Sequence, residues 1–166
     1  MDILVLSDSH GAVAPMVRAV ELTRPDLILH LGDCWRDGEQ LHARFPDIPL
    51  EQVPGNCDLR PGEPAERLLV LEGKRILLCH GHTYGVKTSL LAAGFAAEEQ
   101  QLDLFLFGHT HRPLVDRRGR TLFLNPGSIS LPKGDGIHSY MVYEDGVFTT
   151  KDIDGNVLET LDIRRG

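Results

Sequence analysis

The segment ILVLSDSHG, residues 3–11, decides the fold of this chain, because a short apolar run passes directly into polar side chains that can bind ligands. The same transition recurs in LILHLGD, residues 27–33, and in LEQVPGNCD, residues 50–58. Short apolar runs closed by polar residues and glycine are typical of strands buried on both faces of a parallel sheet. With helices predicted over Ala12–Thr23 and Gly38–Phe45, the chain is expected to open as a βαβαβ unit.

The rest of the chain has a different pattern, in which turn signals separate short strands. Four hairpin turns are expected, at Glu72-Gly73-Lys74, Arg118-Gly119, Asp145-Gly146 and Asp154-Gly155. The expected strands are Arg67–Leu71, Arg75–Cys79, Leu104–Phe107, Tyr140–Tyr143 and Val147–Thr150. A helix is expected from about Val86 to Gln101. We therefore predict an α/β fold of two packed sheets with helices outside them, forming a single domain over residues 1–166.

Composition excludes several classes of protein. The 166 residues carry a formal net charge of −7, whereas sequence-independent binding of nucleic acid needs a basic surface. No apolar run approaches the roughly 20 residues that span a bilayer, and the apolar run at the N-terminus is too short for a signal peptide. Three cysteines without a CxxC pair indicate free thiols in a reducing compartment. We expect a cytoplasmic protein that binds neither membrane nor nucleic acid stably.

Ligand-type side chains recur at intervals of 23 to 29 residues, which is about one strand–helix–strand unit. Seven of them stand just past the end of an apolar run: Asp8, His10, Asp33, Asn56, His80, His109 and His111. Each alone is compatible with an ordinary turn or helix cap. Independent turns have no reason to place such side chains at every strand end, however, and ligands of open α/β sheets bind at the carboxyl edge of the strands. We expect all seven to meet in one crevice.

The residue types indicate a metal centre. Four imidazoles, two carboxylates and one carboxamide suit first-row transition metals in a mixed nitrogen and oxygen shell. Seven ligands are too many for one tetrahedral zinc with an open position, but enough for two ions about 3.5–4 Å apart. The positive charge of two divalent ions exceeds the negative charge of two carboxylates and a hydroxide, so the site would attract an anionic phosphodiester although the chain as a whole is acidic. Mn is the first expectation, with Fe, Ni, Co and Zn left open.

These residues form five ordered blocks: Asp8-x-His10, Gly32-Asp33, Gly55-Asn56-Cys57-Asp58, His80, and Gly108-His109-Thr110-His111. Together they resemble the signature of the calcineurin-like metallophosphoesterases. The GNCD variant, the short chain and the segment Asn125-Pro126-Gly127-Ser128 are similar to the small YfcE-type phosphodiesterases of bacteria and archaea. The resemblance runs from Met1 to about Ser130.

The resemblance implies a four-layer α/β/β/α sandwich with two mixed sheets and a dinuclear centre. The ligands implied for one ion are Asp8, His10, Asp33 and His111. Those implied for the other are Asn56, His80 and His109, with Asp33 as the bridge. The implied reaction is attack of a metal-bridging hydroxide on the phosphorus of a small phosphodiester, and relatives of this type suggest a homo-oligomer.

Four further positions carry open alternatives. Larger relatives have a histidine where this chain has Cys57, so Cys57 is either a weak general acid that favours good leaving groups such as aryl esters, or a small buried filler. Asp58 either orients a neighbouring histidine or closes an Asx turn. His82 either contacts the substrate phosphate or lies in solvent. Asn56 is counted both as a ligand and among the catalytic residues.

Two other functions compete with the phosphodiesterase. One is a non-catalytic scaffold, resembling the small retromer subunit of the same fold that binds partner proteins. The other is a phosphomonoesterase, whose dianionic substrate would call for extra basic residues near the metals. The sequence shows none close to the motifs, which favours the diester, although fold alone does not decide function.

Overall fold

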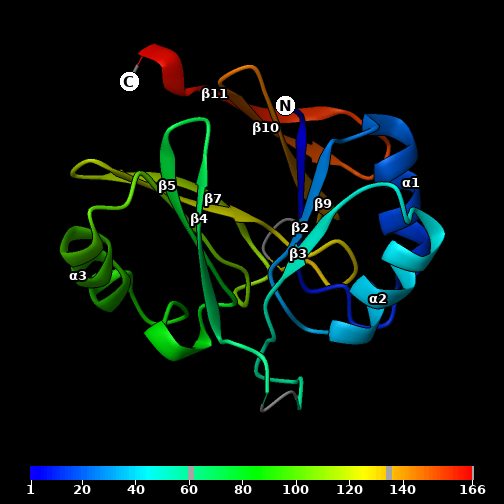
Figure 1. Cartoon of the computed structure of the whole chain (residues 1–166), viewed down its shortest axis with the longest axis horizontal. Coiled ribbons are helices and arrows are strands. Elements are labelled where there is room, and N and C mark those ends of the chain that lie inside the picture. The colour runs from blue at the N-terminus through cyan, green and yellow to red at the C-terminus, as the bar shows by residue number, and fades with distance from the viewer. Residues whose placement is uncertain (60–61, 134–135, 166) are drawn as a thin grey trace.

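A computed structural model describes residues 1–59, 62–133 and 136–165 of the chain. Two mixed sheets pack face to face, with helices on both outer sides (Figure 1). The first sheet has the order β11-β10-β9-β1-β2-β3 and the second the order β4-β5-β6-β8-β7. The predicted α/β/β/α sandwich is therefore confirmed.

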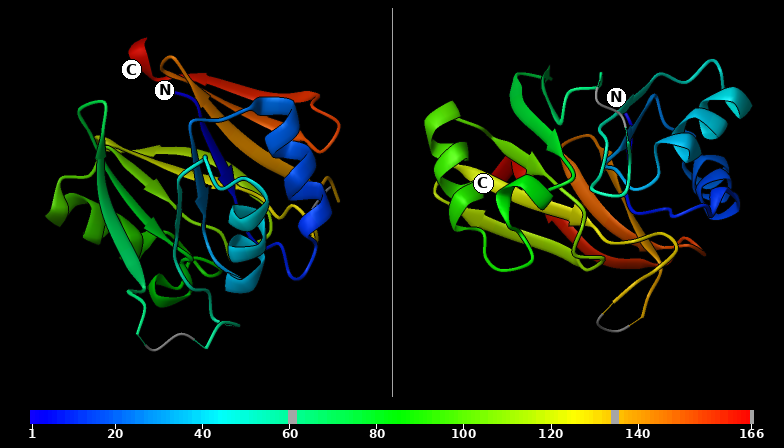
Figure 2. Two further views of the ribbon diagram at one scale, coloured as in Figure 1. Left: turned by 45° about the vertical axis from the view of Figure 1, so that its right-hand side comes forward. Right: turned by 90° about the horizontal axis from the view of Figure 1, so that it is seen from below.

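The first sheet is built around the N-terminal βαβαβ unit. Its strands are β1 (Ile3–Leu6), β2 (Leu27–His30), β3 (Leu50–Gln52), β9 (Ser139–Glu144), β10 (Val147–Asp152) and β11 (Val157–Asp162). The strands β1, β2 and β3 are parallel, as their apolar runs predict, and β9 joins β1 in the antiparallel direction. Two helices, α1 (Val13–Thr23) and α2 (Trp35–Arg44), cover the outer face of this sheet (Figure 2).

The second sheet begins with the hairpin predicted at Gly73. Its strands are β4 (Glu66–Leu71), β5 (Lys74–Cys79), β6 (Leu104–Leu106), β7 (Pro113–Arg118) and β8 (Thr121–Pro126). The helix α3 (Leu91–Gln100) covers its outer face, and two short 3₁₀ turns lie at η1 (His82–Tyr84) and η2 (Ile163–Arg165). All four predicted hairpin turns join antiparallel strand pairs.

Three layers of apolar side chains hold the sandwich together. The central layer fills the space between the sheets, where Val5 and Leu29 of the first sheet meet Leu78 and Leu106 of the second. A second layer lies between the first sheet and the helices α1 and α2, and a third between the second sheet and α3. The strands β1, β2 and β6 are buried on both faces, which explains their continuous apolar runs.

Two predicted helix boundaries are wrong. The helix expected from Val86 begins only at Leu91, and the residues before it form turns in which the N–H groups of Thr88 and Ser89 donate to Gly85 O. The helix expected from Gly38 begins earlier, at Trp35, whose N–H donates to the carboxylate of Asp58 at 2.9 Å. That cap comes from 23 residues away, so no local pattern could indicate it.

The three cysteines are free thiols, as predicted. None of the described helices is long and apolar enough to cross a membrane.

Candidate metal centre

The carboxyl ends of five strands deliver the predicted ligands to one region between the two sheets. In chain order, Asp8 and His10 follow β1, Asp33 follows β2, Asn56 follows β3, His80 follows β5, and His109 and His111 follow β6. The loops are tied to each other by backbone bonds, since Asp8 N–H donates to Gly32 O at 3.0 Å and Gly108 N–H to His80 O at 3.0 Å. The convergence expected from strand spacing is therefore what the fold produces.

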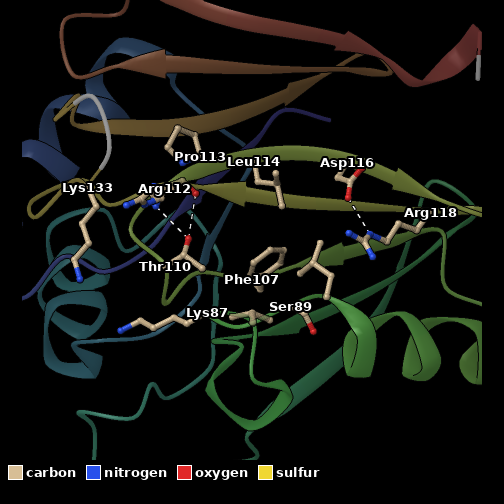
Figure 3. Close-up of a pocket in the computed structure, with 12 residues that line it drawn as sticks. Lys87, Ser89, Phe107, Thr110, Arg112, Pro113, Leu114, Asp116, Arg118 and Lys133 are labelled. Carbon is tan, nitrogen blue, oxygen red and sulfur yellow. Dashed lines mark hydrogen bonds and ion pairs between the residues drawn. The ribbon is translucent and has the colours of Figure 1, made fainter.

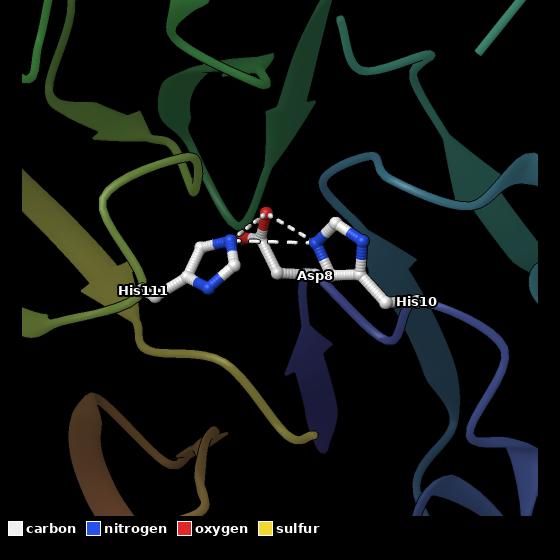
Figure 4. A group of neighbouring side chains, drawn as sticks. All are labelled: Asp8, His10 and His111. Atoms are coloured by element: carbon white, nitrogen blue, oxygen red, sulfur yellow. Dashed lines mark hydrogen bonds and ion pairs between the residues drawn. The ribbon is translucent and has the colours of Figure 1, made fainter. Parts of the chain in front are cut away.

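One cluster joins the end of β1 to the end of β6. Ligand atoms of Asp8, His10 and His111 all lie within 4.8 Å of one another (Figure 4). His111 Nε2 is 3.2 Å from Asp8 Oδ1, and His10 Nε2 is 3.7 Å from the same oxygen. The two imidazole nitrogens are themselves 3.3 Å apart. A carboxylate oxygen and two ring nitrogens at this separation form a site of the kind that divalent metals occupy.

A second cluster lies directly beside the first. It consists of Asp33, His80 and His109, again with ligand atoms within 4.8 Å of one another. His80 Nε2 is 3.2 Å from Asp33 Oδ2. The same Asp33 oxygen is 3.7 Å from His10 Nε2 in the first cluster. Asp33 thus faces both clusters, which is the position that a bridging carboxylate needs.

In each carboxylate, backbone and hydroxyl donors hold one oxygen and leave the other facing the clusters. Asp8 Oδ2 accepts the Ser7 hydroxyl at 2.6 Å and the His109 N–H at 3.0 Å. Asp33 Oδ1 accepts the Cys57 N–H at 3.0 Å. Within the described part of the chain, the buried atoms Asp8 Oδ1 and His80 Nε2 have no hydrogen-bond partner at all. Buried polar atoms are rarely left unpaired, so these two fit atoms that await a cation.

Two of the histidines are oriented by their far ring nitrogens. His80 Nδ1 lies 2.7 Å from Leu31 O, and His111 Nδ1 lies 2.6 Å from Leu131 O. A carbonyl oxygen only accepts, so each Nδ1 carries a proton, and Nε2 is the ring atom that faces the clusters and can bind a metal once the ring is neutral. Metal-binding histidines are commonly fixed in this way.

Charge in the metal-free site favours ionised carboxylates. Burial opposes ionisation of Asp8, but the neighbouring imidazoles of His10 and His111 outweigh it and hold the pKa of that carboxyl well below its usual range. Burial likewise opposes ionisation of Asp33, yet His80 lowers its pKa to about 2. Burial and the positive field of His80 lower the pKa of His109 to about 4. The carboxylate of Asp8 raises the pKa of His10, and burial of His80 is outweighed by Asp33 and Asp8, which raise its pKa as well. Metal ligands must be deprotonated, so a metal ion would displace a proton from each of these two rings.

The backbone at the site is unusual. The residues Asp8, His10, Asp33, His109 and His111 all have φ between 44° and 69°. This left-handed region is uncommon for residues other than glycine, although Asp and His enter it more readily than most. The other non-glycine residues in this region cap helices or form hairpin turns, as Arg24 and Asp145 do. Uncommon backbone conformations concentrate at functional sites, and here they mark five of the seven predicted ligands.

Gly108 makes room for the first carboxylate. A Cβ on this residue would lie 2.6 Å from Asp8 Oδ2 and would collide with the hydroxyl of Ser7. Gly55 makes room for Asp33 in the same way, because a Cβ on Gly55 would overlap Asp33 Oδ1. The glycines of the predicted motifs therefore allow the loops to close on the carboxylates.

The loop of residues 55–58 answers two of the open alternatives. Asp58 accepts the backbone N–H groups of Asp33, Trp35 and Gly55 at 2.8–3.1 Å, so it closes a turn and fixes the Asp33 loop. Among the described residues, its carboxylate accepts from backbone N–H groups and not from a histidine, which favours the turn over the alternative in which Asp58 orients a histidine. Cys57 is exposed, so the buried-filler alternative is wrong.

Asn56, the ligand candidate on the same loop, has an exposed side chain. This side chain makes no hydrogen bond with the residues that the structure describes. His82 lies beside the second cluster, with its ring 5.5 Å from that of His80 and 6.1 Å from that of His109. Its buried Nδ1 has no partner among the described residues. The Asn56 side chain is therefore accessible to a ligand, and the half-buried His82 ring lies at the border of the second cluster.

Sequence reasoning missed several residues that hold the site. The hydroxyls of Ser128 and Ser130 both donate to Asp8 O, at 2.8 and 2.9 Å. Asn125 Nδ2 donates to Gly108 O and to Thr110 Oγ1, both at 3.0 Å. The family resemblance singled out the Asn125–Ser128 segment but none of these contacts. The contact of Ser7 carried no signal beyond its place next to Asp8.

One expectation about charge is wrong. Lys87, Arg112 and Lys133 line a cavity against the loop of His109 and His111 (Figure 3). Arg112 directly follows a ligand candidate in sequence, and the other two are brought near only by folding. The absence of basic residues near the motifs is therefore no argument against a more highly charged substrate.

Comparisons with known proteins agree with this geometry. Residues 1–145 match the model of the calcineurin-like phosphoesterase superfamily domain. The chain belongs to this family. A Bacillus subtilis protein that carries the name probable metallophosphoesterase YsnB is 34% identical over 99% of this chain and 98% of its own length. The phosphodiesterase YfcE of Escherichia coli is 29% identical over 90% of each chain.

Solved structures match over the whole fold. The structure of YfcE, described as a phosphoesterase, superposes with a TM-score of 0.79 at 26% identity, covering 98% of this chain and all of the other. Vps29 of Entamoeba histolytica, solved with Zn²⁺, superposes with a TM-score of 0.80 at 22% identity over 98% and 99% of the two chains. The second likeness shows the fold alone.

Proposed function

We propose that this chain is a metal-dependent phosphodiesterase with a dinuclear centre. One observation carries the proposal: two ligand clusters lie side by side, and the carboxylate of Asp33 faces both. The free oxygen of Asp8 and the free nitrogen of His80 point to the same place. The family supports a phosphoesterase, and the name of the relative YfcE supports the diester.

The residues present fit two divalent ions. We assign Asp8, His10, Asp33 and His111 to one ion, and Asp33, Asn56, His80 and His109 to the other. Bound there, such ions supply the activation of water and the neutralisation of charge on phosphoryl oxygens. The mixed nitrogen and oxygen set accepts Mn, Fe, Ni, Co or Zn, with Mn as our first choice.

The chain's own residues position the substrate. Burial and the charge of His80 lower the pKa of His82, which favours its neutral form, and its half-buried ring beside the second cluster is placed to contact a phosphoryl oxygen. Cys57 is exposed as a residue, but partial desolvation of its thiol and the nearby carboxylate of Asp33 raise the thiol pKa, which keeps the thiol protonated. A protonated thiol can give its proton to a leaving oxygen, though less readily than an imidazole would. Asp58 acts only through the loop that it fixes.

Charge favours a small diester over a large polyanion. Two divalent ions against two carboxylates give the site a formal positive charge, while the whole chain carries −7. Among the described residues, no Lys or Arg forms an ion pair with Asp8 or Asp33. The positive charge is therefore local, which suits a small phosphodiester that reaches the centre better than a long polyanion.

The decisive experiment is hydrolysis of bis-p-nitrophenyl phosphate by protein stripped with EDTA and titrated with Mn²⁺, with p-nitrophenyl phosphate alongside. We expect activity to appear with metal, to favour the diester and to vanish in Asp33→Ala. The exposed Asp47 provides the matched control, since Asp47→Ala removes a carboxylate far from the clusters and should leave activity unchanged. Faster cleavage of the monoester would make the chain a phosphomonoesterase, an outcome for which the cations beside His111 provide a physical basis.

A different result would favour a binding function. If the protein binds Mn²⁺, Ni²⁺, Co²⁺ or Zn²⁺ and turns over neither ester, the centre serves as a structural or partner-binding surface. The likeness to Vps29 shows that this fold also occurs outside the phosphoesterase relatives.

A further inference from the structure

A cavity of about 620 Å³ lies next to the candidate metal centre, on the far side of the loop that carries His109 and His111. The turns before α3 form one wall and the strand β7 forms the other. Phe107 and Leu114 give the cavity an apolar floor. Its size is that of a ligand-binding pocket for a small molecule.

The lining of this cavity is strongly basic. Four basic residues line it against one acidic residue, a formal charge of +3 in a chain of −7. The one carboxylate, Asp116, is already paired with Arg118 at 2.9 Å. Lys87, Arg112 and Lys133 form no ion pair with any described residue. Three cations that have no ion-pair partner in the described part of the chain repel one another around this cavity, so an anion bound among them would relieve that repulsion.

The three cations stand at the end of the cavity nearest the centre. Figure 3 shows them around Thr110, with the Asp116–Arg118 pair at the opposite end. Thr110 lies between the two ligand candidates of the loop, and its Oγ1 accepts the N–H of Arg112 at 3.1 Å. The N–H of Lys133 donates to His111 O at 2.9 Å. The backbone positions of Arg112 and Lys133 are therefore fixed relative to the loop.

We propose that this cavity binds a second phosphate group of the substrate, so that the substrates are phosphodiesters carrying an additional phosphate. Lysine and arginine side chains are the usual partners of phosphate in proteins, and arginine can bind it with two parallel hydrogen bonds. The apolar floor beyond the cations accommodates the uncharged part of the same molecule. This inference rests on the proposed function, because it places the scissile diester at the metal centre.

Two chromogenic esters separate the second phosphate from the chemistry. Thymidine 5′-(p-nitrophenyl phosphate) and the same compound with a 3′-phosphate release the same leaving group. We expect the Mn²⁺-loaded protein to favour the 3′-phosphorylated ester by about tenfold or more in kcat/KM, since hydrogen bonds between charged groups are worth at least that factor. The triple variant Lys87→Ala, Arg112→Ala, Lys133→Ala should bring the ratio of the two substrates close to one.

The control removes a cation from the strand that forms one wall of the cavity, without changing the cavity lining. Arg117 is exposed on β7 and does not line the cavity, so Arg117→Ala should keep the substrate ratio of the parent protein. A second readout needs no turnover. Thymidine 3′,5′-bisphosphate should bind the metal-free protein at least tenfold more tightly than it binds the triple variant, as measured by calorimetry.

The outcomes distinguish the two proposals. If the unphosphorylated ester is cleaved but the second phosphate brings no preference, or if the triple variant keeps the preference, the cavity inference is wrong and the phosphodiesterase stands. If neither ester is cleaved by protein that binds metal, the proposed function is wrong and the inference falls with it.

Discussion

The hydroxyl of Ser7 offers a sharp test of how the centre is held. Ser7 is fully buried, and its hydroxyl donates to Asp8 Oδ2 at 2.6 Å. The only other donor to that oxygen among the described residues is the N–H of His109 at 3.0 Å. The change Ser7→Ala therefore leaves a buried carboxylate oxygen with one donor in place of two. The Asp8 carboxylate thus loses one of the two hydrogen bonds that orient it but keeps its charge.

The expected magnitude follows from the charge of the acceptor. A hydrogen bond to a charged group contributes about 1.5–3 kcal/mol, so Ser7→Ala should lower the free energy of unfolding of the metal-free protein by that amount. For a chain of this size the melting temperature should fall by about 3–12 °C. Loss of a group that orients a metal ligand typically weakens metal binding about 10–100-fold, and we expect the same here.

Ser139 is the matched control. It is also fully buried, and its hydroxyl donates to the uncharged carbonyl oxygen of Pro126 at 2.8 Å. Ser139→Ala should cost about 0.5–1.5 kcal/mol and leave metal affinity unchanged. Urea unfolding of the metal-free proteins measures the first quantity, and calorimetric titration with Mn²⁺ or Zn²⁺ measures the second. Equal metal affinities of Ser7→Ala and Ser139→Ala would refute the reasoning.

Three further predictions concern the same region. Gly108→Ala should destabilise the protein by several kcal/mol and abolish metal binding, because the Cβ of the new alanine would lie 2.6 Å from Asp8 Oδ2. Unfolding followed by circular dichroism checks the stability, and metal titration checks the affinity. A variant of normal stability and affinity would contradict the close packing. Burial lowers the pKa of His30 to about 4, whereas the pKa in the unfolded chain is near 6.5. Between these two pH values the unfolded state binds a proton on His30 that the folded state does not bind. His30 therefore lowers the free energy of unfolding by about 3 kcal/mol as the pH falls from 6.5 to 4. NMR titration of the imidazole should find it neutral at pH 5.5, and a midpoint above 6 would overturn that expectation. Cys57→His should raise turnover of alkyl phosphodiesters, whose leaving oxygen needs a proton, about tenfold or more while changing aryl esters little; an equal effect on both classes of ester would count against a role in protonation.

Much of the fold could be predicted because its signals are local. The apolar runs at β1 and β2 indicated parallel, doubly buried strands, and Gly73, Gly119 and Gly146 marked hairpin turns, since both features depend on neighbouring residues only. The start of α3 was misplaced because Val86 and Leu90 are buried and continue the helical pattern, although they pack from turns. The cap of α2 by Asp58 was missed because its two partners lie 23 residues apart.

The sequence by itself determined which residues share a sheet edge. Parallel strands end at a common edge, so the polar residues that follow β1, β2 and β3 had to meet at one edge of the first sheet, and those that follow β5 and β6 at one edge of the second. The packing of the two sheets then brings these two edges together. Six of the seven now form two adjacent clusters, and the seventh, Asn56, stands on the neighbouring loop as a predicted ligand.

Only the tertiary structure decided how those residues are held and what surrounds them. The contact of Asp8 with the His109 N–H joins residues 101 positions apart, and that of Ser128 with Asp8 joins residues 120 apart. Lys87, Arg112 and Lys133 are likewise separated along the chain and meet around one cavity. A pattern in sequence reports the period of a strand or helix, whereas the partner of a side chain across two packed sheets depends on how the whole core fills space.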